Sequence, residues 1–389
     1  MKSLILYSLL FLMLFGCTNV SQTPDNNIPP EEVASPDEEN NEPGDDVLPG
    51  KEDKGLFYEF EEDSLTLLKN MTTEEKVGQM FLARCPEDEK LSLYLSMRPG
   101  GFILFGRDFY GKTKEEIVKS INYYQENSNI PMIIGVDEEG GAVVRVSSNP
   151  NLASEPYKSP QELFSLGGYE EIKRDTEEKS KLLKSLGINL NLNPVADVST
   201  DPEDFIFDRS FGKSAEETAL YVKTVVEAAQ ENKISSTLKH FPGYGNNTDT
   251  HTGSAYDKRP YEEFLSSDFI PFNAGIEAGA ESILISHNIV ESIDGKQPAS
   301  LSRKVIDILR NDLEFTGIIM TDDLSMGAVS ETASPEVRAV LAGCDMLIVS
   351  DLETSYNELL SAVSRGDISE DRIDESVLRI IKWKCYFSS

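Results

Sequence analysis

The feature that most constrains the fold is a rhythm of short apolar runs, each followed by a longer amphipathic or charged stretch. Short apolar runs rich in β-branched residues are typical of strands that are buried on both faces. Their alternation with stretches of helical character indicates parallel strands joined by helices. We count eight runs: MFLARC (80–85), GFILF (101–105), PMIIGVD (131–137), INLNLNPVAD (188–197), SSTLKHF (235–241), SILISHN (282–288), GIIMTDD (317–323) and DMLIVSD (345–351).

The stretches around these runs carry helix signals. Thr72 and Glu75 have the spacing of a capping box in front of an amphipathic segment. Residues 369–384, SEDRIDESVLRIIKWK, place their apolar side chains on one helix face behind a serine cap. Eight strand and helix units predict an α/β fold, a (β/α)8 TIM barrel formed by residues 56–389 as a single catalytic domain. An open, doubly wound sheet would show the same alternation and stays open at this point.

The N-terminal segment, MKSLILYSLLFLMLFGC, consists of a lysine near the start, an apolar run and Cys17. The run is short for a membrane span, so residues 1–16 predict a secretion signal peptide. The stretch LFGC resembles the lipobox of bacterial lipoproteins, whose cysteine is lipidated after cleavage; an ordinary signal peptide is the alternative. Residues 17–55 have almost no large apolar side chain and a clear acidic excess. We therefore expect a lipidated Cys17 followed by a disordered acidic linker.

Charge and cysteine content exclude several classes of function. Asp and Glu total 68 against 36 Lys and Arg, a formal net charge of −32. This charge argues against nucleic-acid binding and against direct adsorption to anionic lipid, so any membrane contact would come through the lipid anchor alone. Cys85, Cys344 and Cys385 lie in or beside apolar segments without CxxC spacing, which predicts buried thiols. We expect no metal ion, no cofactor and a monomer.

Polar side chains gather where the predicted strands end, which is where TIM barrels carry their chemistry. They are Asp137 and Arg145 after the third strand, Asn193 and Asp197 after the fourth, Lys239 and His240 after the fifth, His287 after the sixth, and Asp322 with Asp323 after the seventh. The chain has only three histidines, and all three belong to this predicted rim. Such confinement of a rare residue type predicts a functional site there.

The stretch LKHFPGYGNNTDTHTG, residues 238–253, holds two of the three histidines. Alternate residues of an extended loop can turn the same way, so Asp249 is placed to accept a hydrogen bond from one ring nitrogen of His251. That pairing would orient the imidazole and leave its other nitrogen to exchange protons with a substrate. The glycines of this stretch would let the loop bend. The alternative reading is an ordinary polar loop.

Two further motifs end predicted strands. GIIMTDDLSMG ends a strand with two consecutive carboxylates, and because successive side chains point to opposite faces, only one of Asp322 and Asp323 should face the barrel mouth. One would act as a nucleophile or metal ligand, the other as an outer hydrogen-bonding group or helix cap. VDEEGGAVVRV combines Asp137, a glycine turn and Arg145, groups that suit sugar hydroxyls or a carboxylate.

With these motifs assembled, the chain resembles glycoside hydrolase family 3, most closely its single-domain, NagZ-like β-N-acetylhexosaminidase branch. The resemblance runs from about residue 57 to the C-terminal helix, and the motifs occur in the family's order: GGFILF, VDEEGG, NLNPVADV, DRSFG, KHFPGYG, DTH, PASLS and TDDLSM. It implies a retaining glycosidase that removes terminal β-linked N-acetylglucosamine, often from peptidoglycan fragments.

The resemblance also implies residue roles. Asp322 matches the catalytic nucleophile, His251 the general acid/base and Asp249 its partner. The groups that hold the terminal sugar match Asp137, Arg209, Lys239 and His240. His287 lies near the site without a firm role. The chain departs from the family at Tyr244, where histidine is common, and at Thr250, where serine is common. The resemblance therefore does not specify the fine positioning of this loop.

Several alternatives remain open at this point. A β-glucosidase or xylosidase of the same family is disfavoured by the DTH motif. A phosphorylase is a second alternative, since an imidazole repels phosphate less than a carboxylate does. A non-catalytic sugar-binding lipoprotein would share the lipobox and linker, although intact Asp322, Asp249 and His251 argue against it. We expect a carbohydrate substrate and an extracytoplasmic enzyme, lipid-anchored to the outer face of the cell membrane.

Overall fold

The computed structural model describes residues 55–247, 249–250 and 253–388. All of the described residues belong to one compact unit, Asp53–Ser389. The predicted signal peptide, Cys17 and nearly all of the linker therefore lie outside the described residues. None of the helices in the described ranges combines the length and the apolar character that crossing a membrane requires.

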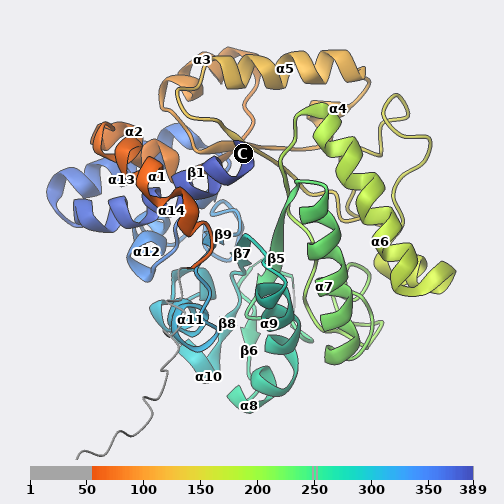
Figure 1. The fold of residues 1–389 in the computed structure, drawn as a ribbon. Coiled ribbons are helices and arrows are strands. Elements are labelled where there is room, and N and C mark those ends of the chain that lie inside the picture. Colours follow the sequence, from red (N-terminus) through yellow and green to blue (C-terminus); the bar gives the residue numbers. More distant parts are fainter. Residues whose placement is uncertain (1–54, 248, 251–252, 389) are drawn as a thin grey trace, which may run out of the picture. The chain divides into compact units, whose positions relative to one another are not determined.

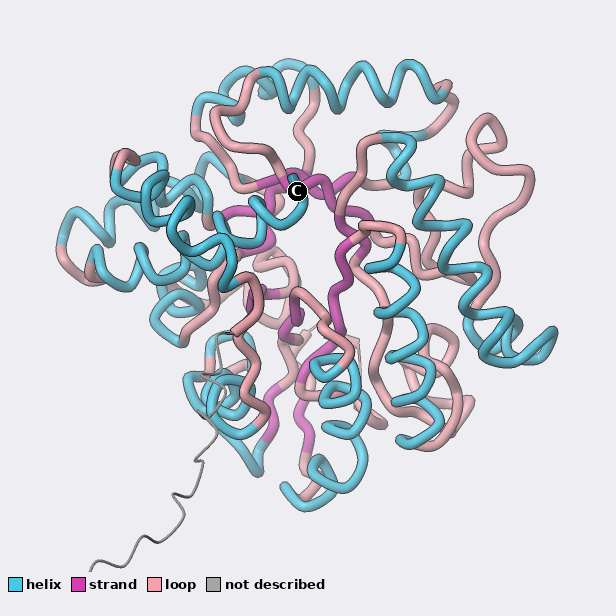
Figure 2. The backbone as a smooth tube through the Cα atoms, viewed as in Figure 1, coloured by secondary structure: helices cyan, strands magenta, loops and turns pink. Residues whose placement is uncertain are grey.

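The centre of the fold is a parallel sheet of eight strands (Figures 1 and 2). The strand order is β10-β1-β2-β3-β4-β5-β7-β9, so neighbouring strands follow one another along the chain. A parallel bridge between Met320 in β9 and Met346, just before β10, joins the two ends of this order. This closure confirms the (β/α)8 TIM barrel and excludes the doubly wound sheet. The strands are β1 (Phe81–Arg84), β2 (Gly101–Leu104), β3 (Ile133–Val136), β4 (Leu190–Asn191), β5 (Ser235–Phe241), β7 (Ser282–Ile285), β9 (Ile318–Thr321) and β10 (Leu347–Val349).

Each of the eight predicted runs contains one of these strands, although β4 is shorter than its run. A separate two-stranded sheet pairs β6 (Tyr256–Asp257) with β8 (Ile289–Val290). The helices lie outside the barrel (Figure 1). They are α1 (Glu61–Lys69), α2 (Thr73–Gln79), α3 (Asp88–Ser96), α4 (Gly106–Phe109), α5 (Lys114–Glu126), α6 (Pro160–Leu186), α7 (Ala215–Glu231), α8 (Tyr261–Glu263), α9 (Phe269–Glu277), α10 (Glu291–Asp294), α11 (Arg303–Asp307), α12 (Pro335–Ala342), α13 (Leu352–Arg365) and α14 (Glu370–Ser388).

The helix ends form where the sequence predicts them. The Thr72 hydroxyl accepts from the backbone N–H of Glu75, whose carboxylate accepts from Thr72 N–H in return, so the capping box is confirmed. At the start of α14, Ser369 Oγ accepts from Arg372 N–H at 3.2 Å. These side chains satisfy backbone donors that a helix terminus leaves without a partner.

Buried apolar side chains fill the barrel and the layer between strands and helices. All residues of β2, β3, β5, β7, β9 and β10 are buried. Cys85 and Cys344 are buried free thiols, as predicted, and Cys385 is half-buried. Burial raises the pKa of Cys85 to about 11 and that of Cys344 to about 12, so both stay protonated and act as packing groups.

Candidate active site

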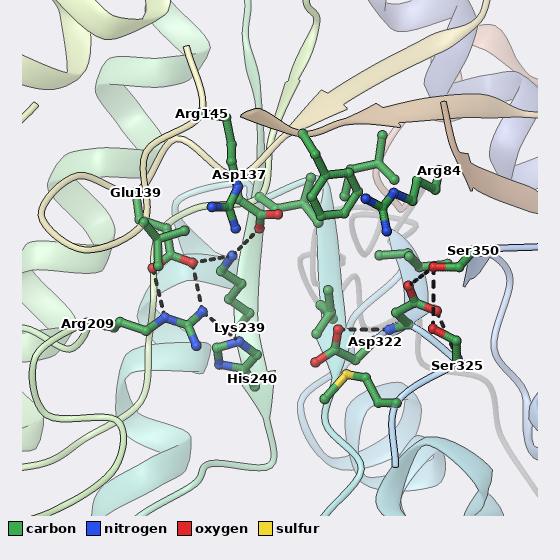
Figure 3. Close-up of a pocket in the computed structure, with 18 of the residues that line it drawn as sticks. Arg84, Asp137, Glu139, Arg145, Arg209, Lys239, His240, Asp322, Ser325 and Ser350 are labelled. Atoms are coloured by element: carbon green, nitrogen blue, oxygen red, sulfur yellow. Dashed lines mark hydrogen bonds and ion pairs between the residues drawn. The ribbon is translucent and has the colours of Figure 1, made fainter. Parts of the chain in front are cut away.

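A cavity of about 580 Å³ opens at the C-terminal ends of the barrel strands (Figure 3). Its lining residues come from all eight barrel strands or the segments that follow them, so residues far apart in the sequence meet there. Of the predicted site residues, the cavity brings together Asp137, Arg209, Lys239, His240, Asp249 and Asp322. Thr248, His251 and Thr252 lie outside the described residues, so the placement of His251 stays a prediction.

One side of the cavity is formed by four charged side chains, here called the ion cluster: Asp137, Glu139, Arg209 and Lys239. Lys239 Nζ lies 2.7 Å from Asp137 Oδ1 and 2.6 Å from Glu139 Oε1. Arg209 donates to both Glu139 oxygens, from Nε at 3.0 Å and from Nη2 at 2.8 Å. Two cations face two carboxylates, so the ion cluster is balanced in charge, and Figure 3 shows it gathered on one side of the cavity.

Burial and charge act in opposite directions on the ion cluster. Burial alone would raise the pKa of Glu139, but the charges of Lys239 and Arg209 hold it well below its usual range. Burial would likewise lower the pKa of Lys239, and the carboxylates of Asp137 and Glu139 raise it instead. Glu139 and Lys239 therefore both carry their charges at neutral pH. A water-poor wall of fixed charges suits the recognition of sugar hydroxyls.

His240 lies between the ion cluster and Asp197. Its Nδ1 is 2.7 Å from Asp197 Oδ2, and its Nε2 is 3.2 Å from Arg209 Nη2. A guanidinium only donates, so Nε2 accepts and Nδ1 carries the proton that it donates to Asp197. Asp197 also accepts from the backbone N–H groups of His240 and Tyr244, at 3.0 and 2.8 Å. The imidazole is thus held in one tautomer and one orientation.

The turn after β3 is built around Glu138. This buried carboxylate accepts from the backbone N–H groups of Arg145 and Val146, at 2.7 and 2.6 Å, and from Ser147. Gly140, with φ +102°, lies so close to Lys158 O that a Cβ would meet it at 2.1 Å. The glycine requirement of the VDEEGG motif follows, because the turn that aims Asp137 and Glu139 into the cavity has no room for a side chain.

The two consecutive aspartates after β9 have different partners. Asp322 Oδ1 accepts from the backbone N–H of Asp323 at 2.8 Å, and Asp322 lies across the cavity from the ion cluster (Figure 3). Asp323 accepts from Ser325 N–H at 2.9 Å and from the Ser350 hydroxyl at 2.7 Å. Both aspartates line the cavity, which differs from the expectation that only one faces the mouth. The hydrogen bonds of Asp323 nevertheless match the predicted outer role.

The loop between β5 and β6 brings Asp249 to the cavity. Within it, the hydroxyls of Tyr244 and Thr250 lie 2.5 Å apart, so both departures from the family meet in one hydrogen bond. Arg259, just after β6, donates from Nη2 to Asp257 at 2.8 Å and from Nη1 to Asp268 at 2.8 Å. Arg259 Nη2 also donates to Gly243 O at 3.5 Å, so the guanidinium links the start of the loop to Asp257 and Asp268.

His287 is a buried residue that supports the backbone next to the cavity. It is fully buried, its Nδ1 lies 2.7 Å from Ser300 Oγ, and its Nε2 lies 3.0 Å from the backbone oxygen of Asp323. Since a carbonyl oxygen only accepts, Nε2 carries the proton. His287 therefore stabilises the backbone just after β9 and helps to position Asp322 and Asp323.

Two residues were missed as functional candidates by the sequence reasoning. Glu139 stands within the VDEEGG motif, and its signal was a second carboxylate two residues after Asp137. Arg84 is the last residue of β1 and lines the cavity. Its signal was a charged residue at the end of an apolar run, the same signal that identified the site residues of the later strands. In the described part of the chain, His, Cys, Asp and Glu side chains do not form a group of three or more suited to a metal ion.

The barrel cavity carries Asp322 on one side and, opposite it, a wall of fixed charges for hydroxyl groups, an arrangement that suits a glycoside hydrolase. The profile of the glycosyl hydrolase family 3 N-terminal domain matches residues 72–383. The chain therefore belongs to glycosyl hydrolase family 3.

Several proteins are similar to this chain. A β-hexosaminidase from Xanthomonas campestris pv. campestris (strain B100) is 30% identical over 272 residues, 68% of this chain and 81% of that protein. The β-hexosaminidase LpqI from Mycobacterium tuberculosis (strain ATCC 25618 / H37Rv) is 27% identical over 269 residues, 66% of this chain and 68% of that protein.

Among solved structures, a family 3 β-N-acetylglucosaminidase from Paenibacillus sp. str. FPU-7 superposes with a TM-score of 0.76 at 29% identity. The match covers 82% of this chain and 64% of the Paenibacillus chain, so this chain spans less than two thirds of that protein.

Proposed function

We propose that the chain is a retaining exo-β-N-acetylglucosaminidase that removes terminal β-linked N-acetylglucosamine through a covalent glycosyl ester on Asp322. Membership of family 3 and relatives named β-hexosaminidase support this activity. The observation that carries the proposal is the arrangement of the cavity, in which Asp322 lies opposite the ion cluster. The ion cluster offers fixed charges to hydroxyl groups, which suits the recognition of a terminal sugar.

In the first step of the proposed reaction, a carboxylate oxygen of Asp322 attacks the anomeric carbon of the sugar. The bond from that carbon to the leaving oxygen breaks, its electron pair stays with the oxygen, and protonated His251 supplies the proton. In the second step, neutral His251 takes a proton from water, the water oxygen attacks the same carbon, and the ester bond breaks to restore the Asp322 carboxylate. Asp249 would orient the imidazole throughout.

The described residues support separate roles for the two sides of the cavity. The ion cluster and His240 have fixed positions before any substrate binds, because each donor already has an acceptor. Sugar hydroxyls then meet preoriented charges, which favours binding in one pose. Asp322 lies across the cavity from the ion cluster, which suits a nucleophile that attacks a sugar held there.

The biological setting is also a proposal. A lipidated Cys17 and an acidic linker would hold the barrel on the outer face of the cell membrane, where partly trimmed wall glycans are available. The substrate would be a glycan or muropeptide that ends in N-acetylglucosamine, and the enzyme would act as a monomer. Metabolic labelling with a fatty acid, in the parent and in a Cys17→Ala variant, tests the anchor, which is wrong if the label persists in the variant.

The activity is tested with the barrel domain on aryl β-N-acetylglucosaminide and aryl β-glucoside, with and without phosphate, beside an Asp322→Asn variant. We expect turnover of the N-acetyl substrate, retention of configuration and loss of turnover in the variant. Preference for the glucoside would make the chain a β-glucosidase, and a phosphate-dependent sugar phosphate would make it a phosphorylase. Sugar binding without turnover of either substrate would overturn the catalytic proposal.

A further inference from the structure

Lys179 is a buried cation of α6 that has no part in the reaction proposed above. Its side chain is 4% exposed, and along the whole of α6 only Asp175 and Lys179 combine a charge with a buried position. An ammonium group loses its hydration when it is buried, which is unfavourable unless acceptors and an opposite charge replace the water. The contacts that replace this water therefore define what Lys179 does.

Three contacts surround the ammonium group of Lys179. Its Nζ lies 3.1 Å from Asp175 Oδ2, one helical turn earlier in α6, and it donates to the backbone oxygen of Glu139 at 3.1 Å. It also lies 5.2 Å from the centroid of the Tyr157 ring, within the range of a cation–π contact. Asp175 compensates the charge of Lys179, while the bond to Glu139 joins α6 to the turn after β3.

The backbone of Glu139 is held from both sides. Its N–H donates to Val143 O at 3.0 Å, and its carbonyl oxygen accepts from Lys179. The segment that contributes Tyr157 contacts the same turn, because Tyr157 O accepts from Gly141 N–H at 2.9 Å. Lys179 is thus enclosed by α6, by the turn that carries Glu139 and by the segment that precedes α6.

Glu139 connects Lys179 with the cavity. The carboxylate of Glu139 contacts Lys239 at 2.6 Å and Arg209 at 2.8 and 3.0 Å. The direction of the Cα–Cβ bond follows the orientation of the backbone, so a hydrogen bond that fixes the Glu139 carbonyl also limits where this carboxylate can lie. Lys179 itself is not among the residues that line the cavity. Its effect on a bound sugar would therefore pass through Glu139.

We propose that Lys179 is a positioning residue for the terminal sugar: its hydrogen bond to the Glu139 carbonyl aims the Glu139 carboxylate, and this sets the geometry of the ion cluster. The inference rests on the proposed function, in which the ion cluster holds the terminal sugar. Lys179 touches neither the sugar nor the reacting atoms. Asp175 has the separate role of compensating the charge of Lys179, so mutation can separate the two roles.

Two variants separate positioning from stability. Lys179→Met removes the ammonium group and leaves Asp175 buried without its counter-charge, so it should lower the urea concentration at the midpoint of unfolding. The double variant Asp175→Leu/Lys179→Met replaces the ion pair by apolar side chains of similar volume, an exchange that is often neutral or stabilising. It should therefore recover most of the lost midpoint, although it still lacks a donor to the Glu139 carbonyl.

Turnover of an aryl β-N-acetylglucosaminide, and its inhibition by free N-acetylglucosamine, measure how well the sugar is held. In both variants we expect kcat/KM to fall about 10- to 100-fold, as for a positioning group displaced by up to about 1 Å, and the inhibition constant to rise. Asp175→Asn is the reverse case, because it removes the counter-charge but keeps the donor to Glu139. Its midpoint should fall while its inhibition constant stays at the parent's value. The matched control is Lys181→Met, which removes an ammonium group paired with Glu177 on the exposed face of α6 and should leave turnover and inhibition unchanged.

The outcomes differ for the two proposals. If the double variant recovers the midpoint while its kcat/KM stays low and its inhibition constant stays high, the positioning role is supported. If it recovers the midpoint together with the parent's kinetics, Lys179 is a structural residue and this inference alone is overturned. The same holds if Asp175→Asn raises the inhibition constant as much as Lys179→Met does. Failure of the parent to cleave any N-acetylglucosaminide overturns the proposed function and this inference with it.

Discussion

Glu139 offers the sharpest test of the ion cluster, because replacing it by glutamine changes the charge with little change of shape. The side chain is buried, and its two oxygens accept from Lys239 and from Arg209 at distances between 2.6 and 3.0 Å. In Glu139→Gln, one carboxylate would remain for two buried cations. The amide nitrogen of the glutamine would also have to face a group that only donates.

The expected effect is large for both stability and activity. Removing one partner from a buried ion pair costs about 3–5 kcal/mol, because the remaining charges stay buried without compensation. Misplacement of a substrate-positioning group by about 1 Å can lower the rate about 100-fold. We therefore expect Glu139→Gln to lower the free energy of unfolding by about 3–5 kcal/mol and kcat/KM by about 100-fold.

Urea denaturation and turnover of an aryl N-acetylglucosaminide measure the two quantities. The matched control is Glu138→Gln, at the neighbouring position, where the carboxylate is equally buried but accepts only from neutral backbone and hydroxyl groups. The control should lose less stability, because the groups that it leaves without an acceptor are neutral. The reasoning is refuted if Glu139→Gln stays within about 1 kcal/mol and threefold of the parent.

Three further predictions concern pH dependence and the loop between β5 and β6. Burial raises the pKa of Glu281 from 4.5 to about 7, so the stability it contributes is fully present below about pH 4.5 and is lost as the pH rises through about 7. The quantity to compare is the free energy of unfolding of Glu281→Gln minus that of the parent, measured by urea denaturation. We expect this difference to be about 3 kcal/mol more favourable to the variant at about pH 8 than at about pH 4. The same difference at both pH values would contradict the prediction. Arg259→Met should remove the link from Gly243 in the loop to Asp257 and Asp268 and slow an alkyl N-acetylglucosaminide, which needs proton donation, about tenfold more than a dinitrophenyl one; an equal loss for both leaving groups would mean that the loop does not position the acid. Gly245→Ala places a Cβ 2.4 Å from Arg259 Cζ at φ +51°, so it should show the same leaving-group dependence and combine with Arg259→Met less than additively in a double-mutant cycle.

The sequence was sufficient to predict the barrel and the identity of most of the charged residues that line the cavity, because both depend on local patterns. Each apolar run marks a strand, and a polar residue after a run must lie at the carboxyl edge of a parallel barrel. That geometry brings Asp137, Lys239 and Asp322 to one cavity although they are far apart in the chain. The choice between a closed and an open sheet required the bridge between β9 and β10, which leaves no sequence pattern.

Pairing between side chains was less predictable, because it depends on distances across the barrel. The sequence shows Glu139 as one of two consecutive glutamates, but only the fold reveals that Glu138 binds the backbone of its own turn while Glu139 contacts Lys239 and Arg209. That Arg84 lines two cavities is likewise visible only in the fold. The predicted pair of Asp249 and His251 is still a prediction from local spacing and family resemblance.

The central claim is that Asp322 forms a covalent bond to the sugar. The direct measurement is mass spectrometry of peptides from enzyme that was quenched while turning over a 5-fluoro-N-acetylglucosaminyl fluoride, a substrate with slowed deglycosylation. The account predicts one fluorinated N-acetylglucosaminyl group on the Asp322 side chain, and no label in Asp322→Asn. A label on Asp323 or another residue, or turnover without any covalent label, would contradict it.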